Sequence, residues 1–93
     1  RFRKALLSER EQLARTLTLE VGKPIAQARA EITATGDRIE FFLHHTAEAL
    51  EEEFVYRDAA QRLEERIAWE PLGVVANVSA WNYPYFVGTN VLV

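Results

Sequence analysis

The stretch Pro71-Leu72-Gly73-Val74-Val75-Ala76-Asn77-Val78-Ser79-Ala80-Trp81-Asn82-Tyr83-Pro84 decides the fold class of this chain. Val74–Val78 is nearly continuously apolar and β-branched at three of five positions, which is typical of a strand buried on both faces. Pro84 lacks an N–H group and suits the first turn of a helix. Trp81 and Asn82 are therefore predicted in a strand-to-helix crossover, at the carboxyl end of a buried strand, where open α/β sheets bind ligands.

Two amphipathic helices are predicted upstream of this stretch. Apolar residues recur at helical spacing, first at Phe2, Leu6, Leu7, Leu13, Ala14 and Leu17, then in a stripe at Ile25, Ala28, Ile32, Thr35, Ile39, Phe42, Thr46 and Ala49. Gly22 should end the first helix, and Pro24 should open the second at its first position. Gly36 costs about 1 kcal/mol of helix propensity, so we interpret it as permitting a close backbone crossing. The helices are expected to pack through Leu6, Leu13, Leu17, Ile32 and Ile39.

One strand is predicted over about residues 62–70, between the helices and the Pro71–Pro84 stretch. The pattern there approaches period two, with Ile67 and Trp69 on one face and Arg66 on the other, and Pro71 ends it. We expect this strand at a sheet edge or in a ribbon that protrudes from the main body. The order helix, helix, strand, strand, helix fits an α/β fold.

Composition excludes several classes of function. The net charge of −3 argues against a nucleic-acid partner, whose phosphates require a basic face. No stretch has the length of a membrane span, so we expect no membrane partner and a cytoplasmic location. The chain has no cysteine, hence neither a disulfide framework nor a thiolate metal site. It starts without methionine and stops inside an apolar run, so we expect a piece of a larger protein.

The quoted residues carry a family resemblance. Pro71-Leu72-Gly73-Val74-Val75 followed by Trp81-Asn82-Tyr83-Pro84 resembles the first coenzyme-domain strand and the oxyanion loop of the aldehyde dehydrogenase superfamily. Leu19-Glu20-Val21-Gly22-Lys23-Pro24 resembles the Glu-x-Gly-Lys-Pro element between that family's first two long helices. The resemblance extends over essentially the whole chain. It implies that residues 1–93 form a single N-terminal fragment of an aldehyde dehydrogenase domain.

The resemblance also implies how this truncated α/β fragment is organised. Residues 1–53 would form two long helices, and 62–70 a strand of a protruding ribbon in the oligomerisation element. Residues 71–93 would supply the first strand of a Rossmann-type coenzyme domain, the oxyanion loop and the start of a helix. The parent enzyme would be a homo-oligomer, either a dimer or a tetramer.

The implied activity is oxidation of an aldehyde to a carboxylic acid with NAD or NADP, through a cysteine thiohemiacetal. The catalytic cysteine and glutamate would lie outside this chain. Asn82 would point its side-chain NH₂ at the developing oxyanion, since a neutral donor stabilises charge without itself titrating. Ser79, Ala80, Trp81 and Asn82 would follow the ribose and nicotinamide side of the coenzyme. Tyr83 would face the substrate tunnel.

Two positions depart from the common family pattern. Ala80 stands where proline is usual, which restores an N–H group and leaves the loop freer before coenzyme binds. Tyr83 replaces the more usual phenylalanine and adds a hydroxyl group to the tunnel. Neither change removes a catalytic group, but the second bears on substrate preference.

Other interpretations stay open from the residues alone. Asn82 could cap the helix that Pro84 begins. His44 and His45 point about 100° apart on a helix without ligand partners at metal-binding spacing, so we expect surface or packing histidines and no metal. Glu31 matches a position where relatives bind a monovalent cation, although an isolated helical carboxylate is usually solvated. Lys23 should act structurally, near the carboxyl end of the first helix, where the dipole favours a cation.

Two further hypotheses concern the function of the whole chain. It could be a helical interaction module that folds alone, with Trp81 and Asn82 filling a core. It could also belong to a scaffold protein that keeps the fold without the catalytic thiol. The next stretch of coding sequence distinguishes these hypotheses from the enzyme.

Overall fold

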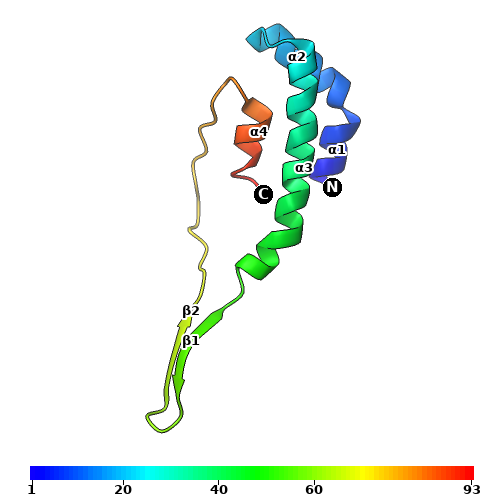
Figure 1. Ribbon diagram of the computed structural model, residues 1–93. Coiled ribbons are helices and arrows are strands. Elements are labelled where there is room, and N and C mark those ends of the chain that lie inside the picture. The colour runs from blue at the N-terminus through cyan, green and yellow to red at the C-terminus, as the bar shows by residue number, and fades with distance from the viewer.

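Helix α3 (Ile25–Ala49) is the axis of the molecule, and each of the other helices packs against it (Figure 1). The computed structural model describes all residues from 1 to 93. Helices α1 (Phe2–Ser8) and α2 (Arg10–Val21) lie along one side of α3, and the short α4 (Pro84–Thr89) lies along another. A β-hairpin extends beyond the end of α3, which makes the molecule 67 Å long and 24 Å by 19 Å across.

The predicted first helix is interrupted by one irregular residue. Glu9, with φ −97° and ψ 12°, separates α1 from α2. The hydroxyl of Ser8 donates to the main-chain oxygen of Ala5 at 2.9 Å, a local bond that competes with regular helix geometry. The spacing of apolar residues did not predict this break, because the helical pattern is found on both sides of Glu9. The end of α2 is as predicted: Gly22 is left-handed (φ 75°) and donates its N–H to Thr18.

The apolar stripes meet where the sequence predicted. The buried core consists of Leu6, Ala14, Leu17, Ala28, Ile32 and Ile39, with Leu13 partly buried against it. The predicted packing of the first two helical segments is therefore confirmed. The stripes are buried only along their middle, since Phe2 is 51% exposed and Thr46 and Ala49 are also exposed. Pro24 was predicted at the first position of this helix. It is the N-cap instead, and α3 begins one residue later, at Ile25.

Gly36 is the point where α1 crosses α3 closely, as predicted. A Cβ atom at this position would lie 2.8 Å from Cδ2 of Leu7, which is closer than real Cβ contacts come. The guanidinium Nε of Arg3 donates to the main-chain oxygen of Gly36 at 2.9 Å. Absence of a side chain at Gly36 thus allows α1 to approach the backbone of α3.

The ribbon predicted from residues 62–70 is an antiparallel hairpin of β1 (Glu53–Asp58) and β2 (Leu63–Ile67). Glu53 pairs with Ile67, and Asp58 pairs with Leu63. In the turn, Asp58 Oδ1 accepts hydrogen bonds from the N–H groups of Ala60 and Gln61. Strand β1 was not predicted from the sequence. The run Phe54-Val55-Tyr56, which has high β-propensity, was the signal that could have revealed it.

The buried strand predicted over Val74–Val78 does not form among these residues. The chain runs without helix or strand from Ala68 to Ala80, and the side chains of Val74 and Val78 are 104% and 95% exposed. A strand buried on both faces needs a neighbour on each edge and cover on each face. The only sheet here is the β1–β2 hairpin, so neither condition is met and no Rossmann-type sheet is present. None of the helices is long and apolar enough to cross a membrane.

Candidate functional site

The predicted turn before a short helix is present around Asn82. Residues 81–83 form a turn and bend, and Pro84 is the first residue of α4. The N-cap of α4 is Tyr83, and no side chain caps this helix. The alternative in which the Asn82 carboxamide caps the helix is therefore wrong. The side chain of Asn82 is exposed, and the residue is held through its main-chain oxygen.

A buried lysine holds this loop from the α2–α3 connection. The ammonium Nζ of Lys23 donates to the main-chain oxygen of Asn82 at 2.6 Å and to Oε2 of Glu31 at 2.5 Å. The same nitrogen lies 3.3 Å from the centroid of the Tyr83 ring, in a cation–π arrangement. The helix dipole predicted a structural role for Lys23 but none of these partners, of which Asn82 and Tyr83 are 59 and 60 positions away along the chain.

Glu31 is the partner of Lys23 and lies in the interior of the helical part. Its side chain is fully buried, so the expectation of a solvated carboxylate is wrong. Oε1 accepts the main-chain N–H groups of Tyr85 at 3.0 Å and Phe86 at 3.3 Å, in the first turn of α4. Those N–H groups lack partners within the helix, and a negative charge is favoured beside them. One carboxylate thus joins α3 to both Lys23 and α4.

The aromatic side chain that follows this loop is kept neutral. Burial raises the pKa of the Tyr85 hydroxyl above its usual 10.0, and the negative charges of Glu20 and Glu31 act in the same direction. The ring packs against the core between the helices. Tyr85 therefore contributes to the anchoring of α4 as an uncharged residue.

The residues predicted along the coenzyme lie on an open face of the loop. Ser79, Ala80 and Trp81 are all exposed, and their main-chain groups are not used by a helix or a sheet. Ser79 lies beside Gly88 of α4, where an added Cβ would be 3.4 Å from its hydroxyl oxygen. Asn77 strengthens the same contact by donating its side-chain N–H to the oxygen of Gly88 at 3.2 Å. The segment is therefore tied to α4, while its polar groups remain accessible to a ligand.

The two histidines lie on the exposed surface of α3. Nδ1 of His44 is 2.8 Å from the main-chain oxygen of Glu40, and the His45 ring lies 4.6 Å from that of Phe41. No group of three or more His, Cys, Asp or Glu side chains is arranged to hold a metal ion. Both oxygens of Glu31, the residue at the position that resembles a cation site, already have protein partners.

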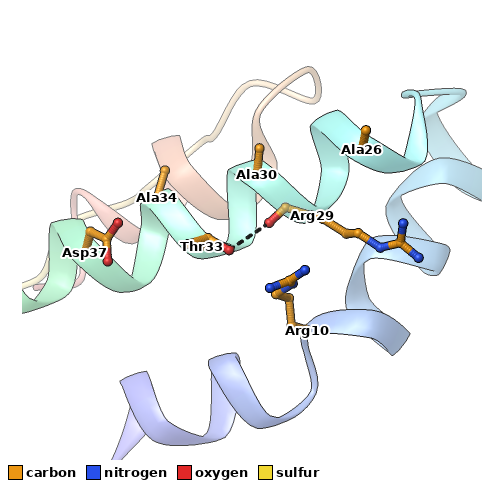
Figure 2. A pocket seen from close by; sticks show the side chains of 7 residues that line it. All are labelled: Arg10, Ala26, Arg29, Ala30, Thr33, Ala34 and Asp37. Carbon is orange, nitrogen blue, oxygen red and sulfur yellow. Dashed lines mark hydrogen bonds between the residues drawn. The ribbon is translucent and has the colours of Figure 1, made fainter.

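The largest surface depression, of about 510 Å³, lies elsewhere, between Arg10 of α2 and one side of α3 (Figure 2). Its lining residues are Arg10, Ala26, Arg29, Ala30, Thr33, Ala34 and Asp37. The guanidinium of Arg29 is already paired with both carboxylate oxygens of Glu11. A smaller groove of about 290 Å³ between α3 and α4 does include Tyr83 and Phe86. Only this smaller groove adjoins the Asn82 loop.

Comparison with known proteins identifies the protein family to which the chain belongs. The model of the aldehyde dehydrogenase family matches residues 1–93, and the chain belongs to that family. The chain is 38% identical over 81 residues to a probable succinate-semialdehyde dehydrogenase [NADP(+)] of Synechocystis sp., which covers 87% of this chain and 17% of the relative. A succinate semialdehyde dehydrogenase [NAD(P)+] of Escherichia coli is 33% identical, with the same two coverages.

A plant relative has a similar relationship to the chain. The mitochondrial succinate-semialdehyde dehydrogenase of Oryza sativa is 36% identical over 83 residues, 85% of this chain and 15% of the relative. The chain thus spans about one sixth of the length of the curated relatives that it matches. No solved structure matches the chain.

Proposed function

We propose that this chain forms the oxyanion-loop part of an NAD(P)-dependent aldehyde dehydrogenase that oxidises an aldehyde to a carboxylic acid. The observation that carries the proposal is the Asn82 carboxamide, which is exposed on a loop held at its main chain and free of a helix-capping role. Family membership supports the reaction class. In this proposal, a cysteine and a glutamate from outside these residues complete the active site. The chain itself contains no cysteine.

Asn82 acts at the aldehyde oxygen. A cysteine thiolate adds to the aldehyde carbon, the C=O π electrons move to oxygen, and the Asn82 side-chain N–H donates to that oxyanion. On collapse of the oxyanion to C=O, the hydrogen on the same carbon would leave as a hydride, for which NAD(P)+ held along Ser79, Ala80, Trp81 and Asn82 would supply the acceptor. Water, deprotonated by the glutamate, then cleaves the thioester and releases the acid. Asn82 stabilises both states in which the oxygen carries negative charge.

Ser79, Ala80, Trp81 and Asn82 contribute the coenzyme contacts in this proposal. Their exposure and their unused main-chain groups fit a role in binding a polar ligand along the loop. Tyr83 contributes to the substrate tunnel, and its ring is held in place by the ammonium of Lys23. The coenzyme is NAD or NADP, in agreement with the names of the two bacterial relatives.

The substrate in this proposal is a semialdehyde that carries a carboxylate at its far end. The support is that several relatives are named as dehydrogenases of succinate semialdehyde or glutarate semialdehyde. Values of kcat/KM for succinate semialdehyde and for butanal, which has the same chain length without the carboxylate, test this part. Equal values for the two aldehydes would contradict it.

We also propose that the whole enzyme is a cytoplasmic homo-oligomer, either a dimer or a tetramer. The hairpin supports subunit contacts, because Phe54, Val55 and Ile67 are large apolar side chains that are about half exposed. Burial of such side chains is a principal source of interface stability.

Substitution of Asn82 by alanine in the whole enzyme is the decisive experiment. Loss of one oxyanion donor should lower kcat by roughly 100- to 1000-fold, while coenzyme Kd and Tm change little. Replacement of an N-cap residue typically lowers the free energy of unfolding by about 1 kcal/mol. Because the Asn82 side chain caps no helix, this loss should be absent. Near-normal turnover in a stable, coenzyme-binding variant would contradict the catalytic role of Asn82.

A further inference from the structure

We propose that Lys23 and Glu31 are positioning residues for the oxyanion donor Asn82. This inference rests on the proposed function, because it assigns how the same loop is held in a productive position. Lys23 lies between α2 and α3, Glu31 lies two turns into α3, and neither is near Asn82 in the sequence. The structure brings both of them to the two sides of the loop that carries the carboxamide.

The ammonium group of Lys23 is fully engaged by this arrangement. An ammonium has three N–H donors and no acceptor. One is directed at Glu31 Oε2, one at the main-chain oxygen of Asn82, and the Tyr83 ring lies 3.3 Å from the nitrogen. These contacts fix the peptide group between Asn82 and Tyr83. Because this peptide group begins at the Cα atom of Asn82, its orientation determines where the carboxamide is directed.

Glu31 fixes the chain on the far side of Asn82. Its Oε1 accepts the N–H groups of Tyr85 and Phe86, three and four residues after the carboxamide. Its Oε2 accepts from Lys23, so the same carboxylate controls both anchors. Helix α3 is long and packed on α1, α2 and α4, and it therefore provides a rigid base for the loop.

A purely stabilising role explains this pair less well than a positioning role. The desolvation of two charges offsets most of their attraction, so buried ion pairs add little net stability and are often replaceable by apolar residues. An oxyanion donor, in contrast, has to be held within a few tenths of an ångström of its productive position. The Lys23–Glu31 pair supplies such a constraint through hydrogen bonds of defined direction.

The test is a double-mutant cycle in the whole enzyme with Lys23→Met and Asn82→Ala. Methionine keeps the unbranched apolar stem of lysine, is one heavy atom shorter, and removes all three donors. Because displacement of a catalytic group by about 1 Å can cost about 100-fold, Lys23→Met should lower kcat by up to that factor. Coenzyme Kd should change little. With a small aldehyde as substrate, the double variant should be no slower than Asn82→Ala alone, because the proposed effect of Lys23 on kcat is exerted through Asn82.

Arg29→Met provides the matched control. Arg29 also pairs with a glutamate across two helices, binding Glu11 through two nitrogens, but it does not contact the loop. The control should leave kcat unchanged even if it lowers Tm. A second readout is amide hydrogen exchange of residues 79–87, which Lys23→Met should accelerate and Arg29→Met should not.

The outcomes separate this inference from the proposed function. Normal kcat in Lys23→Met beside an impaired Asn82→Ala overturns the positioning role and leaves the function intact. Additive losses overturn it as well, whereas normal turnover in Asn82→Ala removes the proposed catalytic role of Asn82, on which this inference rests. If Lys23→Met does not fold, Glu31→Gln replaces it, because glutamine keeps an acceptor for the amides and loses the charge. Unchanged kcat and unchanged exchange in Glu31→Gln would then overturn the inference.

Discussion

Gly36 of α3 and Leu7 of α1 are in such close contact that a methyl group added at position 36 would force the Leu7 side chain to move. The Cβ of an alanine at position 36 would lie 2.8 Å from Leu7 Cδ2 and 3.2 Å from Cγ. We expect Gly36→Ala to destabilise the protein, because overpacking costs about 1–3 kcal/mol. Helix propensity would return only about 1 kcal/mol. Thermal unfolding of the two proteins measures the difference.

In a protein that already carries Leu7→Ala, we expect Gly36→Ala to have the opposite effect on stability. In Leu7→Ala the clashing atoms are gone, so Gly36→Ala should there stabilise the protein by about 1 kcal/mol through helix propensity. Destabilisation of the same size in both backgrounds would mean that contact with Leu7 is not the reason for glycine at this position.

Ile32→Asp should strongly destabilise the helical part. Ile32 has no exposed surface and lies in the core cluster, so aspartate there buries a charge without a partner. We expect a loss above about 4 kcal/mol, the range of the most damaging single substitutions. Thr33→Asp, on the exposed adjacent position of the same helix, is the control and should lose much less. Equal melting temperatures for the two variants would show that the wrong face of α3 is taken as buried.

Acid should weaken the contact between α2 and α3 at Glu11. Its hydrogen bonds from Arg29 lower the pKa of the Glu11 carboxyl below its ordinary value of 4.5. A lowered folded-state pKa gives stability that is present above pH 4.5 and is lost as the pH falls through the folded value. Glu11→Gln should therefore flatten the fall of Tm below pH 4.5. An identical acid profile in the variant would mean that the pair contributes nothing in solution.

Tyr83→Phe should change substrate preference more than the turnover of small aldehydes. Phenylalanine keeps an aromatic face for the ammonium of Lys23 and removes only the hydroxyl group assigned to the tunnel. Values of kcat/KM for short and bulky aldehydes measure the effect. Tyr83→Leu is the matched comparison, because it removes the ring and should also lower kcat. Equal proportional changes for all aldehydes in Tyr83→Phe would exclude Tyr83 from the tunnel wall.

Local patterns predicted the helices well because their signals act over a few residues. The apolar stripe on α3, the left-handed Gly22 and the first-turn Pro84 each depend on neighbouring positions, and all three are found as expected. The same local reasoning failed for Val74–Val78. Its composition indicates a buried strand, but pairing depends on other strands, and none is available to it among these residues.

The loop around Asn82 was predicted, but its supports were not. Lys23 and Asn82 are 59 positions apart, and no periodicity in the sequence links them. Glu31 appeared solvated because a helical carboxylate normally is, whereas burial here follows from the amides of α4 packed against it. Contacts between distant polar residues require the three-dimensional structure, since many pairings of opposite charge are compatible with one sequence.

The open segment between the hairpin and α4 carries a risk of self-association. Gly73–Val78 contains three valines and no charge or proline, and it leaves both of its edges unpaired. Short uncharged segments with high β-propensity and free edges are those that stack into cross-β aggregates. The composition that predicts a buried strand at Val74–Val78 is therefore the same one that can template the wrong assembly.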